Sequence, residues 1–467
     1  MRPALTQFKR FLALIILVEF TGTASAQDLQ LSIPEARALA TQTALAGDPE
    51  TARRIAAGLL QADPNDRAAL LVLAAVEPQL GRPTQGRLAG ARAYAVSTTN
   101  AEKYEAARLT ALAAANEGRF TLAQWWLRRA LTVAPTPQDA EQTTADARGV
   151  RNLNPWSSNI ELSFVPSGNV NGGADSRFNV IDGVPFVGLL SADAQALSGW
   201  SGTFSLSTRY RIAASERSQT VLSARAYGRG VLLSSQAKDF LSDAGSTASA
   251  ADFSSASLDF GVRHDHALDN GFYGLGLNLG KAWSAAEFDY SYARFTADRR
   301  VPVSDTLTLS FNASLEQRWD ENDGQDQWRY NLQGTLSRNL ANGDQLSGTL
   351  GFGAVTSDFI NDTARSQTVQ IGYSFGRPIG PTGFQAQVQL SAGVQLQDFD
   401  NYRVAFISVP GGRQDKRVFG SVDLFFSDFS YAGFAPVITL NAGRTDSNVS
   451  RFEHDDASFG FAFRSTF

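Results

Sequence analysis

The chain has 467 residues, enough for two domains, and carries a formal net charge of −5 at pH 7. It contains no cysteine, which excludes disulfides, thiolate metal sites and a lipid-bearing cysteine at a signal cleavage site. The mild acidity, without a block of basic residues, argues against nucleic acid as a partner.

Residues 1–26 predict a secretory signal peptide. Three basic residues precede an apolar stretch at residues 11–18, and an Ala-x-Ala motif ends at Ala26. We therefore expect cleavage between Ala26 and Gln27. Because the segment carries three positive charges and one negative, its removal takes the net charge from −5 to −7. The mature chain has no run of 18 apolar residues, so it is expected to be either soluble or a β-barrel.

Residues 27–150 predict a domain of helical repeats. The region is rich in Ala, Leu and Arg, and its apolar residues recur with the 3.6-residue period of a helix. Gly47, Gly81 and Gly118 begin similar segments, and they are 34 and 37 residues apart. This spacing is close to the 34-residue tetratricopeptide period. A short array of this kind offers a concave surface for a peptide, and a generic helical bundle is the alternative.

Small and chain-breaking residues recur at matching places in these repeats. They are small where paired helices must approach closely, and prolines follow where a helix ends. The second copy has Gly86 at the small position and lacks the closing proline. The predicted packing positions are Gly47, Ala52, Pro64, Gly118, Ala123, Ala130 and Pro135.

Residues 151–467 change to a period of two, which predicts strands. Residues 384–397 give the clearest strand, with Phe, Ala, Val and Leu at even positions and Gln, Ser and Gly at odd positions. Residues 307–316 alternate in the same way. Alternation over ten or more residues suits tilted membrane strands, whereas strands of a soluble sandwich usually have only about 5–6 residues. The pattern therefore favours an antiparallel transmembrane β-barrel.

We expect about fourteen strands, an even number that returns the C-terminus to the side of the helical domain. The connections from odd to even strands are long, at residues 168–199, 229–252 and 399–412, as outer-surface loops are. The connections from even to odd strands are short and turn-like, and one surface connection near residues 284–286 is also short. The expected strands are 157–167, 200–212, 218–228, 253–264, 270–283, 287–298, 304–319, 325–339, 343–357, 365–377, 382–398, 413–427, 432–445 and 455–467.

Two further features fit an outer-membrane barrel. Phe459, Phe461, Phe463 and Phe467 share one face of the last strand, which resembles the sorting signal read by the barrel assembly machinery, although Ser465 departs from that pattern. Tryptophans near strand ends predict an aromatic girdle at the membrane interface, and these are Trp200, Trp283, Trp319 and Trp328.

The sequence predicts no enzyme, no metal and no cofactor. His264 and His266 would share one strand face, but we expect them at a short turn without further ligands. His454 is expected in an outer loop with its acidic neighbours, and the acidic run 320–323 is expected to be solvated rather than a calcium site. No Ser and His pair suited to a barrel hydrolase stands out. Gly274 and Gly276 lie within a strand and are expected to leave room in the lumen.

The architecture resembles that of the surface lipoprotein assembly modulator family. Residues 154–160 and the Asn-rich stretch at 164–171 look like the start of that family's barrel. The resemblance implies a periplasmic tetratricopeptide domain and a fourteen-strand barrel in the outer membrane. It also implies a function, the movement of selected lipoproteins, or of haem- and metal-scavenging proteins, to the cell surface. The implied partners are the exported client protein, outer-membrane lipid, the barrel assembly machinery and periplasmic chaperones.

Two other classes of function stay open at this point. One is a different transporter, either a passive porin or a polysaccharide-export barrel. The inward faces are expected to be mostly neutral amides and hydroxyls, which argues against a polysaccharide exporter with a strongly charged lumen. The other class is a receptor or adhesin barrel that displays the long loops at 168–199 and 229–252.

Overall fold

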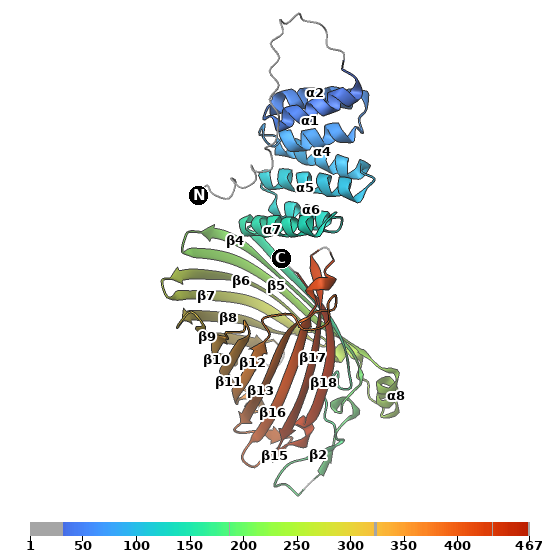
Figure 1. Cartoon of the computed structure of the whole chain (residues 1–467). Helices are drawn as coiled ribbons and strands as arrows, with labels where there is room; N and C mark the ends of the chain where they lie inside the picture. Colours follow the sequence, from blue (N-terminus) through green and yellow to red (C-terminus); the bar gives the residue numbers. More distant parts are fainter. Residues whose placement is uncertain (1–30, 186, 322–324, 432, 466–467) are drawn as a thin grey trace, which may run out of the picture. The chain divides into compact units, whose positions relative to one another are not determined.

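The computed structural model describes residues 31–465, except residues 186, 322–324 and 432. The predicted cleavage site at Ala26 and Gln27, together with Phe467, lies outside the described residues. The chain divides into two compact units at the Asn154–Pro155 junction, a helical unit and a barrel unit (Figure 1). Among the described residues, no helix has the length and apolar character needed to cross a membrane.

Seven α-helices make up the described part of the helical unit, arranged as three hairpins and a final helix. Each hairpin turns at a glycine with positive φ: Gly47 at +85°, Gly81 at +76° and Gly118 at +79°. A residue in the left-handed conformation at the end of a helix costs least free energy when it is glycine. The glycines that repeat in the sequence therefore mark these turns, and their spacing is the spacing of the turns. The helices are α1 (Ile33–Leu45), α2 (Pro49–Ala62), α3 (Arg67–Val76), α4 (Pro83–Val96), α5 (Asn100–Asn116), α6 (Phe120–Leu131) and α7 (Pro137–Leu153).

Alanine and glycine let these helices pack closely. Ala52, Ala123 and Ala130 are fully buried, and Ala52 and Ala130 belong to hydrophobic clusters between helices. A Cβ atom added to Gly90 of α4 would lie 2.4 Å from the Thr110 hydroxyl of α5, so these two helices touch almost backbone to backbone. The two prolines of the repeats, Pro64 and Pro135, follow the ends of α2 and α6. Helical repeats followed by a barrel are therefore the fold of the chain, as predicted.

The barrel unit is a closed antiparallel barrel of fourteen described strands, which confirms the predicted number. Each strand pairs with its neighbours in sequence, and the last strand pairs with the first. Observed and expected strand ends differ by only a few residues at most positions. The barrel strands are β1 (Trp156–Ser167), β4 (Gly199–Ala214), β5 (Ser218–Leu233), β6 (Ser255–Leu268), β7 (Gly271–Ser284), β8 (Glu287–Pro302), β9 (Leu307–Asp320), β10 (Gln327–Asn339), β11 (Gln345–Ser357), β12 (Ala364–Ser374), β13 (Gln387–Phe399), β16 (Arg413–Phe425), β17 (Phe434–Ser447) and β18 (His454–Ser465).

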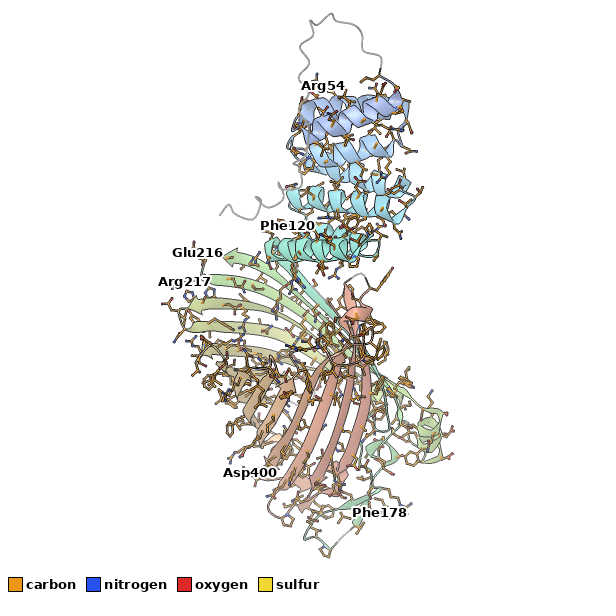
Figure 2. All side chains as sticks on the ribbon, viewed as in Figure 1. Arg54, Phe120, Phe178, Glu216, Arg217 and Asp400 are labelled. Carbon is orange, nitrogen blue, oxygen red and sulfur yellow. The ribbon has the colours of Figure 1, made fainter. Side chains whose placement is uncertain are left out.

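The long and the short connections lie at opposite ends of the barrel. Figure 2 shows Glu216 and Arg217, in the turn between β4 and β5, at one end, and Phe178 and Asp400, in the long connections, at the other. We name these the turn end and the loop end. The loop end carries the connections 168–198, 234–254 and 400–412, close to the predicted ranges. They hold a hairpin of β2 (Phe178–Val180) and β3 (Val187–Leu189), the helix α8 (Ser235–Asp243), and a hairpin of β14 (Arg403–Val404) and β15 (Ile407–Ser408).

All four girdle tryptophans lie within two residues of the loop end of their strands. Trp200 and Trp328 are second in β4 and β10, and Trp283 and Trp319 are next to last in β7 and β9. A ring of tryptophans at one level is typical of barrels at a membrane interface. The predicted position near strand ends is therefore confirmed.

The prediction was wrong for the start of β13. The strand begins at Gln387, so Phe384 lies in the connection 375–386 and not on the strand face. Gly380 and Gly383 have φ of +127° and +84°, and the Phe384 amide donates to the Pro381 carbonyl oxygen at 2.9 Å in a turn. Glycines at positive φ and a turn take the backbone out of the extended conformation that a strand ladder needs. Pro381, which lies between the two glycines, also has no N–H to donate to a neighbouring strand. Two turn-end connections, 375–386 and 426–433, are therefore longer than the short turns that the sequence predicted.

Candidate functional site: an arginine wall in the barrel lumen

The lumen-facing side chains follow from the alternation along each strand. In β9, Leu309, Phe311 and Leu315 share the outward apolar face, while Asn312 and Ser314 are on the other face. Directly paired residues on neighbouring strands lie on the same face of the sheet. The inward and outward faces of β9 therefore identify those of the other strands.

From β11 to β13 the lumen is lined by neutral polar groups, as predicted. The inward faces of these three strands consist mainly of glutamine, serine and threonine with intervening glycine. The hydroxyls of Thr335 and Thr349 are 3.0 Å apart across one pair of strands. This half of the lumen offers hydrogen bonds without fixed charge.

From β5 to β10 the lumen is charged, and here the sequence-based expectation of neutral amides and hydroxyls was wrong. Each of these strands except β7 contributes one to three charged residues to the inward face, so the sequence contains no charged run. The register of neighbouring strands brings them together. We name this patch the arginine wall, made of Arg225, Arg263, Arg294, Arg318 and Arg329 with Asp259, Asp298 and Glu316.

Within the wall, Asp259 and Glu316 are buried, while the guanidinium groups paired with them are more exposed to the lumen. The Asp259 carboxylate is 3% exposed, whereas its partner Arg225 is 47% exposed. Three donors hold Asp259: Arg225 Nε at 3.1 Å, the Asn278 amide at 3.0 Å and the Tyr292 hydroxyl at 3.0 Å. A buried carboxylate is tolerated when its oxygens are saturated with donors in this way.

Glu316 of β9 is the second buried acid of the wall. It is 6% exposed and accepts a hydrogen bond of 2.5 Å from each of two arginines, Arg294 Nε and Arg318 Nε. The Arg318 guanidinium also stacks over the Tyr290 ring at 4.2 Å. These contacts hold both guanidinium groups in fixed positions while part of each stays open to the lumen.

The glycines of β7 make room for the wall to cross that strand. Arg263 on β6 bonds Asp298 on β8 at 2.5 Å, although β7 lies between them. A Cβ atom at Gly274 would lie 2.1 Å from the Arg263 guanidinium. At Gly280 it would lie 2.4 Å from the Tyr292 ring, which crosses β7 from the other side. The predicted role of such glycines, leaving room in the lumen, is thus confirmed for Gly274.

A cavity of about 370 Å³ lies on the side of the wall formed by β8, β9 and β10. Its lining includes Arg294, Arg318 and Arg329 with the inward Asn312 and Asn331. Arg329 bonds the Gln327 side-chain oxygen at 3.0 Å. Fixed guanidinium donors around a hydrated space can bind carboxylates, phosphates or peptide carbonyls, and the part of their attraction that is Coulombic weakens with salt.

The three histidines lie on β6 and β18. His264 and His266 lie inside β6, so their predicted place at a turn was wrong. The ladder continues because Leu268 still pairs with Gly271. The His264 ring is 2.9 Å from the Thr220 hydroxyl, and the His266 ring packs against Tyr273. His454 begins β18 rather than lying in a loop. No cluster of three or more metal-binding side chains occurs among the described residues.

The helical unit carries an aromatic cluster of its own. The Arg129 guanidinium stacks on three rings, Tyr94 at 4.3 Å, Trp125 at 4.7 Å and Trp126 at 4.9 Å. Trp126 is buried, but Trp125 remains 49% exposed. Exposed tryptophan held by an arginine is a common anchor for protein partners. Both tryptophans lie in the third repeat. The sequence pattern alone does not show that Trp126 is buried and Trp125 is exposed.

The residues of the expected sorting signal lie on β18. Phe459, Phe461 and Phe463 all face outward and are exposed on the apolar surface of the barrel. The rings of Phe461 and Phe463 are 5.0 Å apart.

Comparison with known proteins supports the reading of the barrel. Residues 248–467 match the model of a family described as surface lipoprotein assembly modifier. The barrel resembles this family. The match takes in the last eleven barrel strands, β6 to β18, and confirms the resemblance predicted from the sequence. This match and the closed fourteen-strand barrel together support an outer-membrane location for a barrel similar to those of this family. No curated protein matches the chain.

Distant similarities to solved structures are also found. The type III secretion translocator chaperone SycD of Yersinia enterocolitica is 16% identical, with 28% of this chain and 95% of that chain covered and a TM-score of 0.24. A bacterial polysaccharide outer membrane secretin is 11% identical, with 65% and 98% covered and a TM-score of 0.33. A BenF-like porin of Pseudomonas fluorescens Pf-5 is 10% identical, with 66% and 98% covered and a TM-score of 0.34. Nothing about what this chain binds or moves follows from similarities at these values.

Proposed function

We propose that this protein is an outer-membrane translocator that moves one or a few specific lipoproteins, or related secreted proteins, to the cell surface. The observation that carries the proposal is the match of residues 248–467 to the surface lipoprotein assembly modifier family. In this proposal residues 1–26 are removed after export, residues 27–150 work in the periplasm, and residues 151–467 form the translocator. The loop end then faces the cell exterior, and the phenylalanines of β18 are read by the barrel assembly machinery.

The two units suit different steps of such a process. The helical hairpins would hold an unfolded or partly folded client in the periplasm, with Trp125 as one anchor, and periplasmic chaperones would deliver it. The lumen would then give the client a hydrated route, with neutral amides on one side and the arginine wall on the other. Client folding outside the cell would supply direction, because the outer membrane has no nucleotide pool. In this role the protein catalyses no reaction and needs no cofactor.

Protease shaving of intact cells with quantitative proteomics tests the proposal, comparing a deletion of this gene with the parent strain. We expect one or two exported proteins to vanish from the surface and to remain in the periplasm. Deletion of the helical unit alone should have the same effect. An unchanged surface proteome would remove the translocator role and leave a pore or a receptor as the better account.

The arginine wall favours a second candidate, a conduit for an anionic polysaccharide. Guanidinium groups fixed over buried acids give the lumen a cationic face, and the sequence had suggested that no such face existed. If this candidate is right, the deletion strain loses an acidic surface polysaccharide while its surface proteins stay in place. Extraction of surface polymer from the same two strains separates the two functions.

A further inference from the structure

The seam between β1 and β18 is the weakest junction of the barrel. Among the described residues, a single pair, Phe164 with Phe461, is in register between these two strands. Each of the other thirteen neighbouring strand pairs has at least ten pairs in register among the described residues. Both strands have 12 residues, so the difference does not come from short strands.

A seam of this kind is costly inside a membrane unless something completes it. Backbone N–H and C=O groups in hydrocarbon must find partners within the protein, because no water is present to replace them. Since the ladder between β1 and β18 is held at a single pair, these strands separate with the smallest loss of hydrogen bonds. The barrel would therefore open at this seam before it opened anywhere else.

An apolar groove of about 510 Å³ lies on the outward face beside the seam. Phe164 of β1, the residue that pairs across the seam, forms part of its lining together with Phe204 and Trp283. Gly228 and Gly230 of β5 lie at its floor, and a Cβ atom at either position would meet no atom within 4 Å. The groove lies on the membrane face of the barrel, because its lining residues point outward and include aromatic rings. It lies near the loop end, because Trp283 is next to last in β7.

We propose that the seam and this groove form a lateral exit for the acyl chains of a lipidated client. The inference rests on the proposed function, and it adds the chemical class of the cargo and its route. From β5 to β13 most lumen-facing side chains are polar or charged, so each methylene group that passes along them is exposed to water and polar groups at a cost in free energy. Opening of the β1–β18 seam lets the acyl chains stay in an apolar surrounding while the polypeptide remains in the hydrated lumen. The groove receives the chains directly outside the seam, because both share Phe164.

The experiment closes the seam with an engineered disulfide in the full-length protein. The chain has no cysteine, so Phe164→Cys with Phe461→Cys introduces a single defined pair, and paired strand positions lie close enough for a disulfide. The matched control is Ile438→Cys with Phe461→Cys, which links β17 to β18 at a junction that is already fully paired. Surface display is measured for the client and for the same client with its lipidated cysteine replaced by serine, before and after reduction.

We expect the oxidised seam to reduce display of the lipidated client at least tenfold, with recovery on reduction, and to leave the unlipidated client unchanged. The control disulfide should alter neither. If the closed seam exports the lipidated client normally, or blocks both clients alike, the lateral exit for acyl chains is refuted. Failure of the parent protein, which keeps Phe461, to display either client would instead refute the proposed function.

A second variant tests the groove without touching the seam. Gly228→Leu places a side chain in the groove at a position where an added Cβ meets no atom within 4 Å, so the barrel should fold and insert as before. Gly348→Leu is the matched control, since Gly348 also faces outward on β11 with no atom within 4 Å of an added Cβ. We expect Gly228→Leu alone to slow display of the lipidated client several-fold. Equal rates for the two variants, or equal slowing of the unlipidated client, would overturn the assignment of the groove to acyl chains.

Discussion

Replacing Glu316 by glutamine tests whether the arginine wall is held together by its buried acids. The carboxylate accepts one hydrogen bond from Arg294 and one from Arg318, and hydrogen bonds to a charged group are worth about 1.5–3 kcal/mol each. Removing one partner of a fully buried ion pair costs about 3–5 kcal/mol. The arginines are 29% and 20% exposed, so water in the lumen lowers that cost. We expect Glu316→Gln to lower the free energy of unfolding by about 2 kcal/mol.

The assay is urea unfolding of the barrel refolded into lipid vesicles, with Glu161→Gln as the matched control. Glu161 also lies on the inward face, but it is exposed and accepts a hydrogen bond from Asn159. The double variant of Glu316→Gln with Arg294→Gln should be less destabilising than the sum of the single variants, because the two residues share one interaction. Losses for Glu316→Gln no larger than about 0.5 kcal/mol, or full additivity, would contradict the reasoning.

Three further predictions concern other parts of the chain. Hydrogen bonds from the Thr98 and Thr99 amides lower the pKa of Glu102 from 4.5 to about 2. Since folding lowers this pKa, the stability that Glu102 adds is complete above about pH 4.5 and is lost as the pH falls toward 2. The melting temperature of the helical circular-dichroism signal should then fall less over this range in Glu102→Gln than in the parent. Gly280→Ala should destabilise the barrel by about 1–3 kcal/mol, because its Cβ would overlap the Tyr292 ring, whereas Gly348→Ala should stay within about 0.5 kcal/mol in the same urea assay. Trp125→Ala should weaken client binding, measured by titration against the full-length protein, by about tenfold or more with little change in the melting temperature, and unchanged affinity would remove Trp125 from the client surface.

The strand number could be predicted because outward and inward faces differ in every strand. Alternation over ten or more residues has one simple physical cause, a strand with lipid on one side and a polar space on the other.

The connection between β7 and β8 fitted the prediction poorly for a reason that the structure supplies. Ala285 and Ala286 both have positive φ, 50° and 65°, as a two-residue hairpin turn requires. Such turns usually contain Asn or Gly, so two alanines gave no signal.

The arginine wall could not be predicted, because it depends on register between strands rather than on spacing along the chain. Arg263 and Asp298 are 35 residues apart and come together only across an intervening strand. The glycine that allows this contact, Gly274, was visible in the sequence as a small residue facing the lumen. Which side chains occupy the space above it depends on the two neighbouring strands at once.

The seam offers a way to decide between the two candidate functions of the wall. A polysaccharide is polar along its whole length, so a barrel that conducts it has no use for a junction that opens toward lipid. A lipidated protein differs, because it joins a polar chain to acyl groups that the lumen cannot accommodate cheaply. The arginine wall would contact the polar chain. The seam, with one residue pair in register, would let the acyl chains pass to the lipid. The disulfide that closes the seam should therefore leave polysaccharide transport intact, and its effect on surface display separates the two functions.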